Sequence, residues 1–193
     1  MKELVFLVEE PSAKALLESL LPRFLNPTII PRFIPFEGKQ DLGKQLERKL
    51  RGYLNPRARF LVLRDQDSAD CRRVKADLLA KCVAAGRAPA CLVRIACHEL
   101  ETFYLADLVA VETALHCKGL SSQQLTAKFR APDHLSSPSH ELSRLTQNRY
   151  QKVSHSRLLG HYLDLTNTRS TSFAQLIAGI RRLEQQLLAL PDM

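Results

Sequence analysis

The chain has 193 residues, of which 45% are hydrophobic and 25% are charged, values typical of a folded protein with one main core. Lysine and arginine outnumber aspartate and glutamate by 28 to 20, and the resulting net charge of +8 favours polyanionic partners such as nucleic acids. No apolar run approaches the roughly 18 residues of a membrane span, and the N-terminus lacks a signal-peptide pattern, so we expect a cytoplasmic protein without membrane contact.

The first half of the chain alternates strand-like and helix-like segments. Short apolar runs at residues 4–8, 28–36, 60–63 and 91–97 predict four strands. Pro31 and Pro35 place the second strand at an edge of the sheet, because proline cannot donate a ladder hydrogen bond. Apolar residues at helical spacing predict intervening helices at about 11–25, 40–54 and 68–85. This alternation predicts an α/β fold: a small parallel sheet of about four strands sandwiched by helices.

The pattern becomes helical from about residue 101. We expect one helix at 103–115, a loop at 131–140 that is rich in turn-forming residues, and a strong amphipathic helix at 173–187. The expected organisation is an α/β core at residues 1–115 and an α-helical C-terminal extension at residues 116–193 that packs on it. Basic residues should lie on helices at 44–59 and 144–157, giving salt-sensitive binding of nucleic acid without strong sequence specificity.

Several acidic residues follow the predicted ends of three strands. They are Glu9, Asp65, Asp67, Glu99 and Glu101. Ligands of parallel α/β sheets bind beyond the carboxyl ends of the strands. On an extended chain Asp65 and Asp67 would point the same way and could hold one divalent cation, for which oxygen ligands favour Mg²⁺ or Mn²⁺. The alternative is that Asp67 or Ser68 caps the following helix.

A family resemblance strengthens the metal-site hypothesis. The run Val8-Glu9-Glu10-Pro11-Ser12-Ala13-Lys14 resembles the V-E-S-P-[SA]-K opening of the Toprim domain in type I topoisomerases. Toprim domains of primases, topoisomerases and overcoming-lysogenization-defect (OLD) nucleases share a glutamate after the first strand and a D-x-D after the third. The matching residues here are Glu9, Asp65 and Asp67. The resemblance implies a Toprim-like fold with a Mg²⁺ or Mn²⁺ site at these residues, to which Glu99 would add a ligand.

A second resemblance runs almost end to end. Residues 98–107, H-E-L-E-T-F-Y-L-A-D, are similar to the H-E-F-E-A-L-L-F-S-D block of an uncharacterised family of Toprim-like proteins, often encoded beside AAA-type ATPases in bacterial defence loci. The Tyr150-x-Lys152 segment and Arg169 resemble later blocks of that family. The chain departs from it at Glu10, where glycine is usual. It keeps the D-x-D that such relatives weakly retain, which points to an intact site.

The chemistry of phosphodiester cleavage suggests roles for these residues. Divalent ions neutralise charge on the transferring phosphoryl group and can generate hydroxide. Glu9, Asp65 and Asp67 would hold the first ion, and Glu99 or Glu101 would complete a second site or position water.

Basic residues and a histidine complete the candidate site. Lys14, Lys152 and Arg169 would face the substrate phosphate, with a solvated surface position as the alternative for the last two. His98 could act as a general base or metal ligand, or fix its loop through a backbone hydrogen bond. No zinc site is expected, since no cysteines form a C-x-x-C pair.

Two interpretations of function follow. The first is a Toprim nuclease that hydrolyses nucleic-acid phosphodiesters and serves as the effector subunit of an anti-phage system with an AAA- or ABC-type ATPase partner. The second is a catalytically inactive subunit that binds nucleic acid or the ATPase. A Rossmann nucleotide-binding enzyme is disfavoured because no G-x-G-x-x-G follows the first strand, and the chain has no Walker A sequence.

Overall fold

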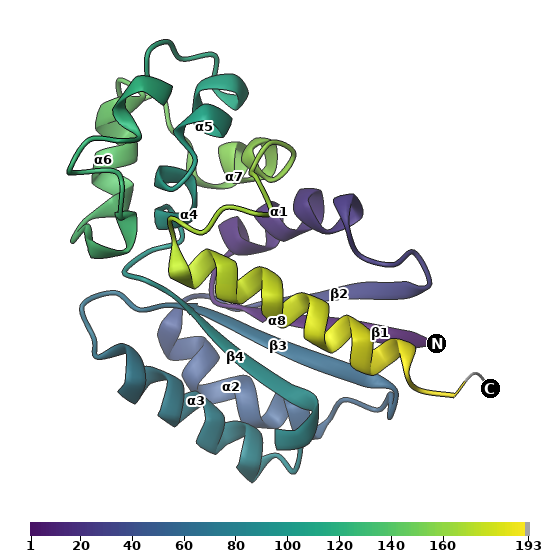
Figure 1. Ribbon diagram of the computed structural model, residues 1–193. Coiled ribbons are helices and arrows are strands. Elements are labelled where there is room, and N and C mark those ends of the chain that lie inside the picture. Colours follow the sequence, from purple (N-terminus) through teal and green to yellow (C-terminus); the bar gives the residue numbers. More distant parts are fainter. Residues whose placement is uncertain (192–193) are drawn as a thin grey trace.

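A computed structural model of the protein describes residues 1–191 and has a four-stranded parallel sheet at its centre (Figure 1). The strands are β1 (Lys2–Val8), β2 (Ile29–Pro35), β3 (Ala58–Asp65) and β4 (Cys91–Ala96). They lie in the order β2-β1-β3-β4. The predicted fold class is therefore confirmed, and β2 occupies an edge, as its two prolines predicted.

Helices cover both faces of this sheet (Figure 1). On one side are α1 (Pro11–Leu20) and α8 (Thr171–Leu188), and on the other are α2 (Lys39–Arg51) and α3 (Cys71–Ala84). Alternate residues of β1 serve the two faces: Leu4 and Phe6 pack in the core under α1 and α8, whereas Val5 and Leu7 pack in the core under α2 and α3. Burial on both faces explains why the strands are continuous apolar runs rather than alternating ones.

The second half of the chain is helical, as predicted. Its other helices are α4 (Thr102–Leu105), α5 (Leu108–Ala114), α6 (Pro138–Leu145) and α7 (Lys152–Gly160). Short 3₁₀ turns occur at η1 (Leu21–Arg23), η2 (Ala88–Ala90), η3 (Ser121–Gln123) and η4 (Pro132–His134). Within residues 1–191 no helix combines the length and apolarity that crossing a bilayer would demand. The predicted division between residues 115 and 116 stays a prediction, although α7 and α8 pack against α1 and the sheet.

The helix predicted at 103–115 is wrong in one respect, because it is two helices that meet at Asp107. One oxygen of the Asp107 carboxylate accepts a hydrogen bond from the backbone N–H of Ala110 at 3.1 Å, which caps α5. The other oxygen accepts from the backbone N–H of Asp164 at 2.8 Å. A buried capping residue with a partner 57 positions away produces a break that helical periodicity does not reveal.

Other predicted boundaries also shift. The helix expected at 44–59 ends at Arg51, and Arg59 lies on β3. The segment 144–157 is the end of α6, a turn and most of α7, and the predicted loop at 131–140 contains η4 and the start of α6. The cap of α3 is Asp70, which accepts from the backbone N–H of Arg73 at 2.8 Å, so neither Asp67 nor Ser68 has that role.

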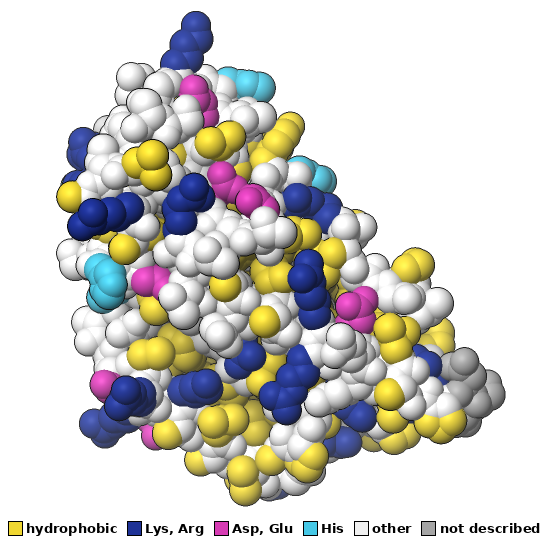
Figure 2. Space-filling model, in the orientation of Figure 1, with side chains coloured by type: hydrophobic (Ala, Val, Ile, Leu, Met, Phe, Trp, Pro, Cys, Tyr) yellow, Lys and Arg dark blue, Asp and Glu magenta, His cyan; other side chains and the backbone are white. Residues whose placement is uncertain are grey.

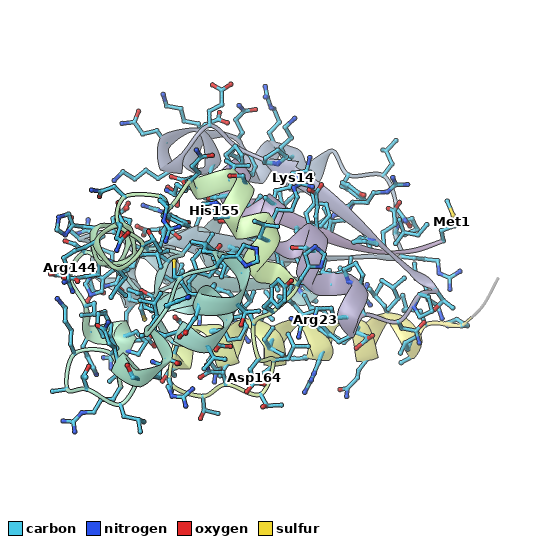
Figure 3. All side chains as sticks on the ribbon, turned by 90° about the horizontal axis from the view of Figure 1, so that it is seen from above. Met1, Lys14, Arg23, Arg144, His155 and Asp164 are labelled. Carbon is cyan, nitrogen blue, oxygen red and sulfur yellow. The ribbon has the colours of Figure 1, made fainter. Side chains whose placement is uncertain are left out.

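Close packing fixes α7 onto α1. Gly160 ends α7 directly over α1: a side chain there would overlap the hydroxyl of Ser19 and lie 2.6 Å from the carbonyl oxygen of Leu16. Arg23, labelled in Figure 3, donates hydrogen bonds to the carbonyl oxygens of Gly160 at 2.9 Å and Leu163 at 2.7 Å. These contacts fix the end of α7 on α1, and at the start of α7 Lys152 pairs with Glu10, which follows β1.

The Gly160 contact gives the first prediction. Gly160→Ala should lower the free energy of unfolding by about 1–3 kcal/mol, the usual cost of overpacking, because the backbone of α1 must move to admit a methyl group. Gly43→Ala is the matched control, since Gly43 lies in the interior of α2 with open space around it and alanine favours a helix by about 1 kcal/mol. Urea denaturation of both variants checks this. Equal shifts of the same sign would contradict the close packing.

Candidate acidic site at the carboxyl edge of the sheet

Three carboxylates gather where β1, β3 and β4 end side by side. Glu9 follows β1, Asp65 ends β3, and Glu101 lies just beyond β4. Glu9 and Asp65 are joined directly, because the Glu9 carboxylate accepts a hydrogen bond from the backbone N–H of Asp65 at 3.1 Å. Asp65 also lies within the electrostatic reach of Glu101. We call Glu9, Asp65 and Glu101 the acidic site.

Glu9 is buried, with 7% of its surface exposed. Burial raises the pKa of Glu9, the hydrogen bond from the backbone of Asp65 opposes that rise, and the negative charge of Asp67 adds to it. The guanidinium of Arg64 lies 3.7 Å from the Glu9 carboxylate and partly offsets the repulsion. Glu9 thus holds a charge that the surrounding protein only partly compensates.

The charged forms of Asp65 and Glu101 are also disfavoured by their surroundings. Burial raises the pKa of Asp65 well above its usual range, and the charges of Glu101 and Glu9 raise it further. Glu101 has no exposed surface, and burial likewise raises its pKa. Tyr150 donates its hydroxyl to one Glu101 oxygen at 3.0 Å, whereas the other oxygen has no hydrogen-bond partner among residues 1–191. An unpartnered buried carboxylate oxygen is costly, so it needs a compensating cation or proton.

Lys152 supplies a second positive charge near the acidic site, from the first position of α7. Its ammonium lies 2.5 Å from the carboxylate of Glu10. Burial lowers the pKa of Lys152, but the hydrogen bond to Glu10 and the charges of Glu101 and Asp65 outweigh this effect and raise it. Lys152 therefore lies beside the acidic residues, and its predicted contact with a substrate phosphate stays a prediction.

Asp67 does not join the acidic site in the predicted way. The strand ends at Asp65, and Asp67 adopts a left-handed conformation with φ of 56°, so the extended geometry on which the shared direction of the two carboxylates depended is absent. The backbone N–H of Asp67 donates to the carbonyl oxygen of His98 at 2.7 Å. Its carboxylate pairs with the ammonium of Lys39 at 2.9 Å. The turn between β3 and α3 thus directs the Asp67 carboxylate toward Lys39.

His98 and Glu99 bind the loop after β4 to other segments. His98 has φ of 57°, and its backbone N–H donates to the side chain of Gln66 at 3.4 Å. Both contacts are made by the backbone of His98 and hold its loop. The catalytic role of its ring stays a prediction. Glu99 accepts a hydrogen bond from the backbone N–H of Ser139 at 2.7 Å, at the start of α6. A carboxylate at a helix N-terminus is stabilising, so Glu99 has a structural partner outside the acidic site.

The other two predicted phosphate-binding residues have local partners. Lys14 forms an ion pair with Glu18, one helical turn further along α1, at 3.5 Å. Arg169 donates to the carbonyl oxygen of Ala106 at 3.4 Å and lies near Asp164, whose pKa it helps to lower after the stronger effect of hydrogen bonds from Thr166. The structure therefore brings Lys152, but not Arg169, into contact with the acidic residues.

Sequence reasoning assigned no role to Tyr150, Glu10 or Lys39. Tyr150 is the tyrosine of the Tyr-x-Lys segment, and Glu10 occupies the position at which the similar family usually has glycine. Both segments were noted only for their resemblance. Lys39 carried no signal, since only folding brings the start of α2 to Asp67. In the structure Tyr150 bonds to Glu101, Lys39 pairs with Asp67, and Glu10 pairs with Lys152.

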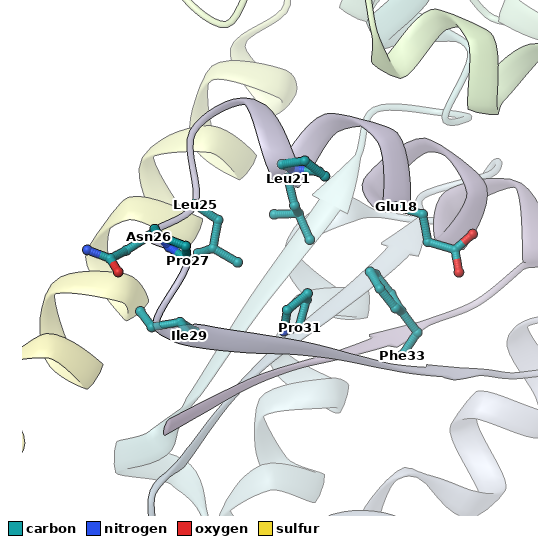
Figure 4. A pocket seen from close by; sticks show the side chains of 9 residues that line it. Glu18, Leu21, Leu25, Asn26, Pro27, Ile29, Pro31 and Phe33 are labelled. Carbon is teal, nitrogen blue, oxygen red and sulfur yellow. The ribbon is translucent and has the colours of Figure 1, made fainter. Parts of the chain in front are cut away.

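Two hollows differ in chemistry. A hollow of about 350 Å³ beside the acidic site is lined by Glu9, Glu10, Glu37, Gly38, Lys39, Gln40 and Asp67. A second hollow of about 360 Å³ lies between the end of α1 and β2 and is mostly apolar (Figure 4). Its one carboxylate, Glu18, is paired with Lys14 and Arg157. Only the first hollow borders the predicted site residues.

The predicted metal site is not preassembled. Among residues 1–191 no three or more His, Cys, Asp or Glu side chains are arranged so that they could hold a metal ion together. The donor chemistry nevertheless suits a hard divalent cation: the acidic site offers only oxygen ligands, the charges of Glu101 and Glu9 raise the pKa of Asp65, and one Glu101 oxygen has no partner among residues 1–191. The metal-binding roles of Glu9, Asp65, Asp67 and Glu99 stay predictions.

Comparison with known proteins supports the fold. A family model described as a domain of unknown function, DUF4276, matches residues 8–181. No curated protein matches the chain. Among solved structures, the chain is similar to the C-terminal region of the Burkholderia pseudomallei OLD protein, with 14% sequence identity, a TM-score of 0.56, and coverage of 94% of this chain and 98% of that one. Identity this low shows a shared α/β fold.

The raised pKa of Asp65 predicts an unusual pH dependence. Folded Asp65 holds its proton to higher pH than the unfolded chain, so stability is lost as pH rises above the ordinary value of 3.8. Asp65→Asn should therefore raise the free energy of unfolding at pH 7.5, against the loss of about 1 kcal/mol that an average substitution causes. The gain should shrink toward pH 4, where the carboxyl is protonated.

Urea denaturation of wild type and Asp65→Asn at both pH values tests this, with Asp77→Asn on the exposed side of α3 as control. A loss of stability at pH 7.5 in Asp65→Asn would contradict the electrostatic account.

Proposed function

We propose that this chain, which belongs to the DUF4276 family of domains of unknown function, is a nuclease subunit that hydrolyses nucleic-acid phosphodiesters at a Toprim-like acidic site. One observation carries the proposal: the carboxylates of Glu9, Asp65 and Glu101 lie at the carboxyl edge of a parallel sheet with raised pKa values, and Lys152 lies beside them. Such clusters are costly to fold around and are characteristic of functional sites.

A divalent cation would relieve the repulsion within the acidic site. Glu9, Asp65 and Glu101 would hold Mg²⁺ or Mn²⁺, since all offer carboxylate oxygens and one Glu101 oxygen lacks a partner. When bound, the cation would neutralise charge on the transferring phosphoryl group and lower the pKa of water. The first predicted ligand set included Asp67 and Glu99 in place of Glu101. Their bonds to Lys39 and to the start of α6 favour supporting roles.

The chain's own groups would orient these ligands and the substrate. Tyr150 donates to one oxygen of Glu101 and thereby directs the other. Lys152 lies between Glu10 and the buried acids, and could exchange its pairing with Glu10 for a substrate phosphate. Because α7 is clamped to α1 at Gly160, the position of Lys152 relative to Glu9 is set by helix packing.

The substrate class and partner rest on different grounds. The net charge of +8 favours a polyanion, and the fold is similar to that of the OLD C-terminal region. The chain has no Walker A sequence, so the resemblance to proteins encoded beside AAA-type ATPases leads us to propose a separate ATPase partner in anti-phage defence. Cleavage assays must therefore include such a partner where one is encoded nearby.

A second function is favoured by the ion pairs of the site. Lys39 pairs with Asp67 and Lys152 with Glu10, and no three acids are arranged around a common point within residues 1–191. A subunit that binds nucleic acid or an ATPase without catalysis would need no more than this. The acids would then only position the loops.

Asp65→Asn distinguishes the two functions. In a nuclease it should reduce cleavage in Mg²⁺ or Mn²⁺ by about a thousandfold, because the charge stabilisation that a metal provides is worth several kcal/mol. Its affinity for nucleic acid should change little. Cleavage of end-labelled DNA and RNA, with the partner ATPase present, measures this.

Asp77→Asn is the control, because it removes an exposed carboxylate far from the strand ends. Since Asp65→Asn is expected to stabilise the fold, lost activity cannot be attributed to unfolding. Equal cleavage by wild type and Asp65→Asn would contradict catalysis at the acidic site, and no cleavage by either protein with both metals would favour the binding subunit.

A further inference from the structure

A groove runs along the free edge of β4, between α3 and α8. It has a volume of about 250 Å³ and is lined by Cys71, Lys75, Val93, Arg94, Ile95, Cys97, Thr171, Ser172 and Gln175. β4 is the last strand of the sheet, so no further strand covers this edge. Figure 2 shows dark-blue basic side chains gathered over the part of the surface where α3, β4 and α8 lie. The groove is therefore a basic surface on an open sheet edge.

Arg94 is held in place in this groove by α8. Its Nε donates to the carbonyl oxygen of Gln175 at 2.7 Å, and its Nη1 donates to the carbonyl oxygen of Val93 at 3.1 Å. The guanidinium crosses α8 at Gly179, where a side chain would come within 2.9 Å of Nε. Glycine inside a helix is about 1 kcal/mol less favourable than alanine. Gly179 therefore makes room for Arg94 at a cost to the stability of α8. The result is a guanidinium fixed in direction before any ligand arrives.

This guanidinium has no acidic partner. Within the described part of the chain, none of the three residues Arg94, Arg182 and Lys75 forms an ion pair. Burial lowers the pKa of Arg94, and the neighbouring charge of Arg182 lowers it further. Asp133 lies at the carboxyl end of the groove, but its carboxylate accepts hydrogen bonds from the backbone and hydroxyl of Ser172. The positive charges are thus concentrated without local neutralisation.

We propose that this groove binds the phosphate backbone of a nucleic acid. With Nε and Nη1 of Arg94 bonded to backbone carbonyl oxygens, the remaining N–H groups of this preoriented guanidinium can donate to phosphate oxygens, and Lys75 and Arg182 add charge on either side. A second copy of the chain fits poorly, because symmetric pairing of β4 edges would bring Arg94 close to its own counterpart.

The groove also leads toward the acidic site. Asp65 pairs in register with Ala96, one residue before Cys97 in the groove wall. Neighbouring strands lie roughly 4.8 Å apart. A strand of nucleic acid in the groove would therefore pass close to the acidic site. This inference deepens the proposed function by naming the surface that holds the substrate, and in that sense rests on it.

The test compares two double variants that remove the same charge. Arg94→Gln/Arg182→Gln changes the groove, and Lys118→Gln/Arg130→Gln changes exposed positions of the helical region. Affinity for a fluorescent 20-base-pair DNA duplex and a 20-nucleotide RNA is measured by anisotropy at several salt concentrations in EDTA. The groove variant should bind at least about tenfold more weakly at low salt, and its log–log salt slope should fall by about 2.

The control should retain most of the affinity. Arg182→Gln alone, at an exposed position, should show about half of the slope change and guards against a folding defect from loss of the Arg94 hydrogen bond. Equal weakening by both double variants, or unchanged binding by the groove variants, would overturn the proposal. Because EDTA prevents metal-dependent cleavage, this outcome is independent of whether Asp65→Asn abolishes catalysis.

Discussion

The repulsion among Glu9, Asp65 and Glu101 is the constraint on which the rest of the site depends. A parallel sheet brings its strand ends to one edge, and here three of those ends are followed by acids, of which Glu9 and Glu101 are buried. The charges of Glu101 and Glu9 make Asp65 harder to ionise. The surrounding structure compensates only in part, through Tyr150 and Lys152. The unpartnered oxygen of Glu101 marks where that compensation is incomplete.

Helix packing places basic side chains around the acidic site at the carboxyl edge of the sheet. The clamp between α1 and α7 fixes the start of α7, from which Lys152 reaches the acids. On the other side of the sheet, α2 brings Lys39 to Asp67 and removes that carboxylate from the cluster. The groove along β4 concentrates positive charge next to the same edge, with Arg94 held over Gly179. Uncompensated negative and positive regions thus lie near each other, an arrangement suited to a cation and a polyanion together.

Sequence patterns predicted the parts of the fold that depend on local chemistry. The four apolar runs became strands, Pro31 and Pro35 marked the edge strand, and the last amphipathic pattern became α8. Patterns failed where a distant partner decides the outcome. Asp107 breaks a helix because it also bonds the backbone of Asp164, and that contact has no local signature.

The candidate site shows the same division. Glu9, Asp65 and Glu101 were all expected just past strand ends, and in the structure they lie at one edge of the sheet. The direction of Asp67 could not be predicted, because a left-handed turn replaces the extended chain after Asp65. The acidic site is proposed to bind a divalent cation, and anomalous scattering from a crystal soaked in Mn²⁺ can locate that ion. We expect an ion within coordinating distance of Glu9 and Asp65, whereas a soaked crystal without density between these carboxylates would rule this site out.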